Sequence, residues 1–117
     1  MMMLTLLVEQ NPLSQGTMKL LLETVNCEVR CLGDVKSLRQ ALESQVFELI
    51  VVSTLSSNKD PLLTAEQSKR VQPLARLVLW GPVVTTLCPS KSSCVDAQLL
   101  MPCTLAQLES AIRVDRR

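Results

Sequence analysis

The sequence has no histidine and no tyrosine, and it contains only one tryptophan and one phenylalanine. Without histidine, the chain has no imidazole to complete a zinc site or to activate a cysteine nucleophile. The shortage of aromatic side chains disfavours a surface that stacks nucleic-acid bases. A net charge of +1 also predicts no strong electric field, so we expect neither nucleic-acid binding nor attraction to an anionic membrane.

The five cysteines show no C-x-x-C spacing of the kind that binds metal or carries redox chemistry. An odd number at scattered positions is typical of reduced thiols, so we expect a cytoplasmic protein. Cys27 and Cys31 are predicted to lie in the core, whereas Cys88 and Cys94 are the candidates for exposure and oxidation. We predict no metal site and no cofactor.

Length and hydropathy limit the number of domains and the kind of protein that the chain can form. With 117 residues, of which 47% are hydrophobic, we expect one domain over residues 1–117 with a real core. The apolar start lacks a basic leader and is followed at once by Glu9, so we expect no signal peptide. No apolar run approaches the ~20 residues that a membrane-spanning helix needs.

Apolar runs separated by turn residues predict five strands, at residues 3–8, 27–32, 48–53, 74–80 and 97–101. The third is apolar on both faces, which is typical of an interior strand of a parallel sheet. Apolar residues at helical spacing predict helices between the strands, with N-caps at Ser14, Asp34, Asp60 and Thr104. The threonines, serines and proline of residues 83–95 predict only a short or frayed helix, or a loop. This alternation predicts an α/β fold, a doubly wound parallel sheet with helices on both faces.

Three segments resemble the receiver domain of bacterial two-component signalling, in the right order and at the right intervals. LVEQNP at residues 7–12 resembles the family's LV(E/D)DNP, and FELIVVS at residues 47–53 resembles FDLILMD. LLMP at residues 99–102, followed by a helix, resembles YLxKP. The resemblance covers essentially the whole chain, and it implies a flavodoxin-like sheet with strand order 2-1-3-4-5.

In that family, an acidic pair after the first strand binds Mg²⁺, and an aspartate ending the third strand accepts a phosphoryl group from a histidine kinase. A hydroxyl after the fourth strand and a lysine after the fifth then sense the phosphate. The matching positions here are Glu9, Gln10, Ser53, Gly81 and Met101. Only Glu9 keeps its chemical type, so the resemblance implies a degenerate receiver without ordinary aspartyl phosphorylation.

Each of these residues also has a purely structural interpretation. Ser53 has no base to activate its hydroxyl, so a strand-end serine is favoured over a modification site. Glu9 is expected to be a solvated loop acid rather than a weak cation ligand. Trp80 is expected in the core, with the alternative that it fills the phosphate space together with the apolar Met101.

The resemblance implies a protein-interaction module rather than an enzyme. Its expected partner is a histidine kinase, a response regulator or an attached output domain, with a homodimer as a further possibility. The family's usual docking surface falls at residues 83–113, where we select Leu87, Lys91, Gln98, Leu100, Leu105 and Gln107. A small-molecule sensor that uses the vacated pocket is the alternative. Flavodoxin-like enzymes rank last, because no cysteine and no phosphate-binding loop follow the first strand.

Overall fold

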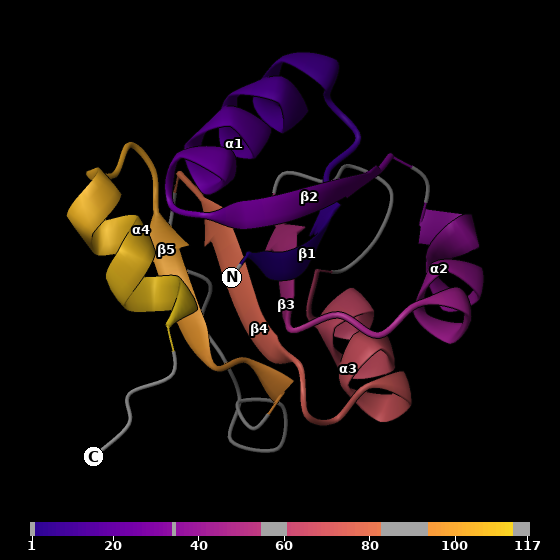
Figure 1. Cartoon of the computed structure of the whole chain (residues 1–117). Coiled ribbons are helices and arrows are strands. Elements are labelled where there is room, and N and C mark those ends of the chain that lie inside the picture. The colour runs from indigo at the N-terminus through magenta and orange to yellow at the C-terminus, as the bar shows by residue number, and fades with distance from the viewer. Residues whose placement is uncertain (1, 34, 55–60, 83–93, 114–117) are drawn as a thin grey trace.

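The computed structural model describes residues 2–33, 35–54, 61–82 and 94–113. A five-stranded parallel sheet lies at its centre, with strand order β2-β1-β3-β4-β5 (Figure 1). The strands are β1 (Met3–Val8), β2 (Cys27–Leu32), β3 (Leu49–Ser53), β4 (Arg76–Gly81) and β5 (Ala97–Leu100). The predicted sheet and its strand order are therefore confirmed.

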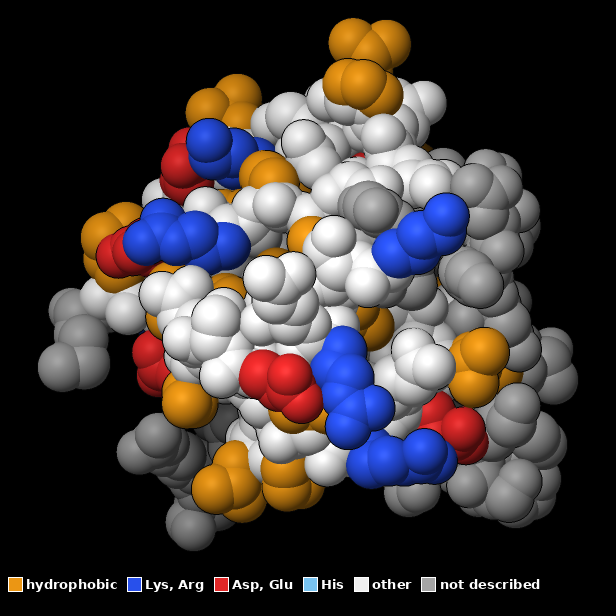
Figure 2. All heavy atoms as spheres, turned by 90° about the vertical axis from the view of Figure 1, so that its right-hand side faces the viewer, with side chains coloured by type: hydrophobic (Ala, Val, Ile, Leu, Met, Phe, Trp, Pro, Cys, Tyr) orange, Lys and Arg blue, Asp and Glu red, His pale blue; other side chains and the backbone are white. Residues whose placement is uncertain are grey.

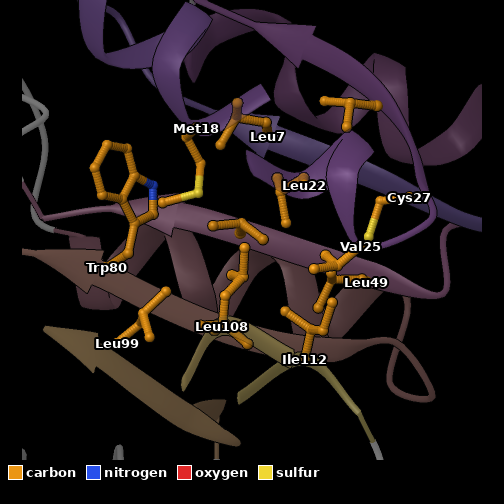
Figure 3. Packing of buried hydrophobic residues seen from close by; sticks show 13 residues of the cluster. Leu7, Met18, Leu22, Val25, Cys27, Leu49, Trp80, Leu99, Leu108 and Ile112 are labelled. Atoms are coloured by element: carbon orange, nitrogen blue, oxygen red, sulfur yellow. The ribbon is translucent and has the colours of Figure 1, made fainter. Parts of the chain in front are cut away.

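Helices cover both faces of the sheet. They are α1 (Pro12–Thr24), the short 3-10 helix η1 (Val35–Ser37) leading into α2 (Leu38–Ser44), α3 (Pro61–Val71) and α4 (Leu105–Ile112). The strands alternate their side chains between two apolar clusters, so Leu49 and Val51 of β3 pack with α1 and α4. Ile50 and Val52 of the same strand pack with α2 and α3. Figure 3 shows the first cluster, in which Met18 and Leu22 of α1 face the sheet.

Helix α1 begins earlier than the sequence predicts. The side-chain oxygen of Asn11 accepts hydrogen bonds from the backbone N–H groups of Leu13 (2.9 Å) and Ser14 (3.3 Å). Asn11 is therefore the N-cap, and Pro12 is the first helical residue. The predicted cap at Ser14 was wrong because Pro12 was interpreted as the end of a strand rather than as the start of a helix.

The predicted cap of the last helix is confirmed as a capping box. The Thr104 hydroxyl accepts from the Gln107 N–H at 3.1 Å, and the Gln107 side chain accepts from the Thr104 N–H at 2.9 Å. The predicted caps Asp34 and Asp60 lie outside the described residues.

The start of one strand and the exposure of two cysteines differ from expectation. Strand β4 starts at Arg76, because Leu74 is 99% exposed in the turn before it. Cys27 is buried as predicted, but Cys31 is exposed because it lies near the end of an edge strand that pairs only with β1. Cys94 is half-buried against the second cluster rather than exposed, and Cys88 is outside the described residues.

A buried glutamine joins the second and third helices. Gln72 follows α3, and its Nε2 donates to the carbonyl oxygens of Leu42 (2.7 Å) and Gln45 (2.6 Å). Its Oε1 accepts from the Phe47 N–H at 2.8 Å. One side chain thus holds the end of α2, the approach to β3 and the end of α3 together. Within the part of the chain described, no helix has the length and apolar character to cross a membrane.

Candidate functional site

The five predicted site positions lie at one edge of the sheet, where the strands β1, β3, β4 and β5 end (Figure 1). The strand register places Val8 beside Val52 and Ser53 beside Trp80. Glu9 and Gln10 directly follow β1, Gly81 ends β4, and Met101 directly follows β5. Sequence reasoning therefore selected residues that the fold brings to the same edge.

Glu9 is buried, with 1% of its surface exposed, so the prediction of a solvated loop acid was wrong. The chain passes from β1 into α1 within a few residues, and this turn brings the carboxyl group inside. Its Oε2 accepts from the Asn11 N–H at 3.3 Å, while its Oε1 has no hydrogen-bond partner. A buried carboxyl oxygen normally has a hydrogen-bond partner, so this oxygen is available to accept one.

Ser53 is fully buried at the end of β3. Its register neighbour Trp80 is 4% exposed and packs in the first apolar cluster, so the expected core position of this tryptophan is confirmed. The indole Nε1 of Trp80 is buried without a hydrogen-bond partner. The end of β3 therefore carries a buried hydroxyl next to a buried indole.

Thr54 occupies the space above the end of β4. A Cβ placed on Gly81 would overlap the hydroxyl oxygen of Thr54, far inside any non-bonded contact. The backbone N–H of Thr54 donates to the Trp80 carbonyl at 2.8 Å, which fixes the threonine in this place. The receiver family has a hydroxyl residue at the position of Gly81. Here the hydroxyl of Thr54, which follows β3, lies next to that position instead. The sequence analysis did not select Thr54. The signal available in the sequence was that Thr54 directly follows β3, while the neighbouring strand β4 ends in a glycine, Gly81.

Met101 is half-buried and packs against the first apolar cluster, as its side-chain type predicts. Its N–H donates to the Gly81 carbonyl at 2.8 Å, and the Met101–Pro102 peptide bond is cis. The side chain at this position therefore contributes apolar packing and no positive charge.

A cavity of about 30 Å³ lies beside these strand ends, lined by Thr54, Leu79, Trp80, Gly81, Gln98, Leu99 and Leu100. A volume of this size holds roughly one or two water molecules. The Thr54 hydroxyl oxygen, which lines it, is buried and has no hydrogen-bond partner, so a water is the natural occupant.

The donors at this edge do not fit the Mg²⁺ ion that a receiver-like fold implies. Mg²⁺ prefers carboxylate and water oxygens in octahedral geometry. Here Glu9 supplies one buried carboxylate, while Gln10 and Ser53 supply neutral groups. Among residues 2–33, 35–54, 61–82 and 94–113, no three acidic, cysteine or histidine side chains form a group that could hold a metal ion. We therefore derive no chemistry through a metal at this site.

Three of the described thiols, those of Cys27, Cys31 and Cys103, have raised pKa values. Burial raises the pKa of Cys27 above its ordinary value of 9.0, although a hydrogen bond with Thr5 opposes the shift. Burial likewise raises the pKa of Cys31 and of Cys103. Raised pKa values keep these groups as thiols at neutral pH, and the thiol is the unreactive form.

The predicted interaction face is described in part. Leu100 of β5 and Leu105 of α4 are exposed, at 50% and 43% respectively. Gln98 is half-buried, and Gln107 is exposed but engaged in the capping box. Leu87 and Lys91 lie outside the described residues.

The fold resembles solved receiver domains although the sequence has diverged. A response regulator protein from Burkholderia pseudomallei, solved with a phosphorylated aspartic acid, matches with a TM-score of 0.82 and 19% identity over 95% of this chain. This chain spans 66% of that protein, just under two thirds. A CheY-like receiver domain from Methylobacillus flagellatus matches with a TM-score of 0.82 and 18% identity, over 94% of this chain and 95% of that one. The chain has a receiver-domain fold.

The receiver domain of a sensor histidine kinase from Pseudomonas aeruginosa, solved with magnesium in the active-site cleft, is similar to this fold as well. Its TM-score is 0.74, with 18% identity over 96% of this chain and 95% of that domain. No family model matches the sequence, and no curated protein matches it. The likeness to receiver domains is therefore found by comparing folds, at 18–19% sequence identity to these three structures.

Proposed function

We propose that this chain is a pseudo-receiver, a protein-interaction module that works in two-component signalling or transcription regulation without aspartyl phosphorylation and without catalytic turnover. The observation that carries the proposal is the state of the strand ends. Ser53 is fully buried where the family has its phosphate acceptor, and Met101 packs, half-buried, against the first apolar cluster where the family has a cation. Neither residue can replace the group that the phosphorylation chemistry needs.

The test is an NMR titration of the ¹⁵N-labelled chain with Mg²⁺ and beryllofluoride, which mimics an aspartyl phosphate. The proposal predicts no saturable shifts at Ser53, Thr54 and Gly81, because no carboxylate is present at the end of β3. A receiver domain that keeps its aspartate serves as the positive control. Saturable shifts confined to these three residues would show a working phosphate site and would overturn the proposal.

The proposed partner is another protein of the same signalling system: a histidine kinase, a response regulator or an attached output domain. A homodimer through the same surface is included. The surface is built on Leu100 and Leu105, which expose apolar side chains on β5 and α4. Large apolar side chains that are exposed on neighbouring elements of a folded protein favour a binding surface. The proposed location is the cytoplasm, where reduced thiols are normal.

A cross-linked pull-down from the native cell extract tests this surface. The double variant Leu100→Glu/Leu105→Glu is expected to lose the captured signalling protein, because two charges enter the apolar contact. Leu13→Glu is the matched control, since Leu13 is 83% exposed on α1. Equal capture by the intact chain and the double variant would contradict the assignment of the surface.

A ligand-sensing site at the strand ends is the second candidate. Three buried polar atoms lack partners there, namely Glu9 Oε1, Thr54 Oγ1 and Trp80 Nε1. A ligand that paired with them would be stabilised, but the cavity of about 30 Å³ has room for water and not for a metabolite. A thermal-shift screen with nucleotides and metabolites tests this candidate, because a ligand that binds the native state raises the melting temperature.

A further inference from the structure

A groove of about 540 Å³ lies between α2 and α3. In Figure 1 these helices stand at the opposite side of the molecule from β5 and α4, so the groove is separate from the surface described above. Leu38 and Leu42 form the apolar part of one wall, and Leu63 and Val71 form that of the other. Leu38 and Leu42 also belong to the core, whereas Leu63 and Val71 remain 42% and 36% exposed.

The rim of the groove carries more positive than negative charge. Lys36, Arg39 and Arg70 line it, against one acid, Glu43. Arg39 and Glu43 form an exposed ion pair at 3.2 Å on the same helix. Arg70 forms no ion pair with any residue that the structure describes. Figure 2, which views this side of the molecule, shows Lys and Arg side chains (blue) beside apolar ones (orange).

A side-chain amide links the two helices at one end of the groove. Gln72 follows the last turn of α3 and donates to the carbonyl oxygens of Leu42 (2.7 Å) and Gln45 (2.6 Å) near the end of α2. The first of these hydrogen bonds is buried and the second is partly buried, so they favour one separation of the two helix ends. A preformed groove avoids the ordering cost that weakens binding to a mobile surface.

We propose that this groove binds an acidic amphipathic helix of another protein. Grooves between helices take up helices whose apolar residues repeat at i, i+3, i+4 and i+7, so the occupant places such a stripe against Leu63 and Val71. The net positive rim selects acidic residues beside that stripe and repels basic ones. The α3 residues that line the groove run from Leu63 to Val71, about 12 Å at 1.5 Å per residue, which is enough for about two turns of a bound helix.

A second copy of this chain does not fit as the occupant. Helix α1 exposes Leu13 and Leu20, but its charged residues are Lys19 and Glu23, which cancel. The acid of α4, Glu109, is already paired with Arg113 at 2.9 Å. No helix among the described residues therefore presents an apolar stripe with acidic flanks.

Nucleic acid and membrane are poorer occupants. The single tryptophan and the single phenylalanine, Trp80 and Phe47, are both buried in the core, so no aromatic side chain is available to stack bases. An anionic membrane binds protruding apolar and basic residues, whereas the apolar residues here line a concave groove.

The experiment is an NMR titration of the full ¹⁵N-labelled chain with a synthetic helical peptide. The peptide has about 14 residues, with leucines at i, i+3, i+4 and i+7 and glutamates on both flanks, and it spans roughly 20 Å. Saturable shifts confined to α2 and α3 are expected, and binding should weaken as salt is added. A second peptide with lysine in place of each glutamate should bind at least about tenfold more weakly.

Charge-swap variants sharpen the test. The variant Arg39→Gln/Arg70→Glu should lose the acidic peptide and bind the lysine peptide instead. Glutamine is used at position 39 because a glutamate would lie one helical turn from Glu43 and repel it. Lys19→Glu, an exposed charge reversal on α1, is the control and should bind the acidic peptide as the intact chain does.

Four outcomes would overturn the proposal. In the first, the acidic peptide does not bind at concentrations up to about 1 mM, and in the second, the two peptides bind equally well. In the third, the shifts map to β5 and α4. In the fourth, only anionic lipid vesicles or single-stranded DNA produce shifts at α2 and α3. The unfolding transition of each variant, followed by circular dichroism, shows that loss of binding is not loss of fold.

Discussion

The Thr54 hydroxyl lies where the Cβ of any larger residue at position 81 would be, so glycine is the residue that fits there. We expect Gly81→Ala to lower the free energy of unfolding by about 1–3 kcal/mol, as overpacking of a tight contact does. Thr54→Ala removes the obstacle. The double variant Gly81→Ala/Thr54→Ala should therefore lose less free energy of unfolding than the sum of the losses in the two single variants. Urea unfolding of the four proteins measures this coupling.

Gly16 provides the control for the glycine substitution itself. It lies inside α1, and a Cβ there would meet nothing within 4 Å. Gly16→Ala should therefore be neutral or stabilising by up to about 1 kcal/mol. Effects of Gly81→Ala and Thr54→Ala that simply add, to within about 0.5 kcal/mol, would show that the two side chains do not compete for this space.

Cys27 makes the free energy of unfolding decrease as the pH rises into the alkaline range. Burial raises its folded-state pKa above 9.0, so the unfolded chain loses this proton first as the pH rises. The stabilising contribution is complete below the unfolded pKa and is lost as the pH rises towards the folded pKa. The chain has no tyrosine, which makes cysteines the main side chains that titrate between about pH 8 and pH 10.

We therefore expect the free energy of unfolding to fall above about pH 9, and to fall less steeply in Cys27→Ala. Urea unfolding of both proteins from pH 7 to pH 10 measures the two slopes. Only the slopes are compared, because the substitution also leaves a small cavity in the core that lowers stability at every pH. Identical slopes would mean that Cys27 does not titrate differently in the two states.

At the scale of secondary-structure elements, Gln72 holds three segments together through its side-chain amide. Gln72→Met keeps the length of the side chain but leaves the Phe47 N–H and the Leu42 and Gln45 carbonyls without this partner. Because an unsatisfied buried group costs about 1–3 kcal/mol, we expect an overall loss of about 3 kcal/mol. Thermal and urea unfolding measure it.

Gln67→Met is the matched control, since Gln67 is exposed on α3, the helix that Gln72 follows. A surface substitution of this kind should change stability by less than about 0.5 kcal/mol. If the two variants were equally stable, the amide of Gln72 would not be the link between α2, β3 and α3.

The elements themselves could be predicted from the sequence, because their signals are local. The apolar run of β3 and the Thr104 capping box each depend on residues that are adjacent along the chain. The details at the site could not be predicted in this way. The burial of Glu9 and the contact of Thr54 with Gly81 depend on where separate strands end in space. No local pattern marks Gln72 as the residue that joins two helices.

At the scale of the whole molecule, the receiver arrangement persists while the chemistry at its strand ends differs. The two apolar clusters and the parallel sheet depend on residue size and hydrophobicity, which diverged sequences can conserve. Phosphoryl transfer depends on a few charged groups in fixed places, and these are the groups that Gln10, Ser53 and Met101 replace. This difference is the basis for proposing that the scaffold serves as an interaction module without phosphorylation.

The measurement that tests this account most directly is intact-protein mass spectrometry after incubation with acetyl phosphate and Mg²⁺. The account predicts an unchanged mass, because Ser53 is fully buried and carries a hydroxyl where the family has a carboxylate. A receiver domain that keeps its aspartate is run beside it as the positive control. The gain of one phosphoryl group, lost in Ser53→Ala, would contradict the central claim that this fold acts without phosphorylation.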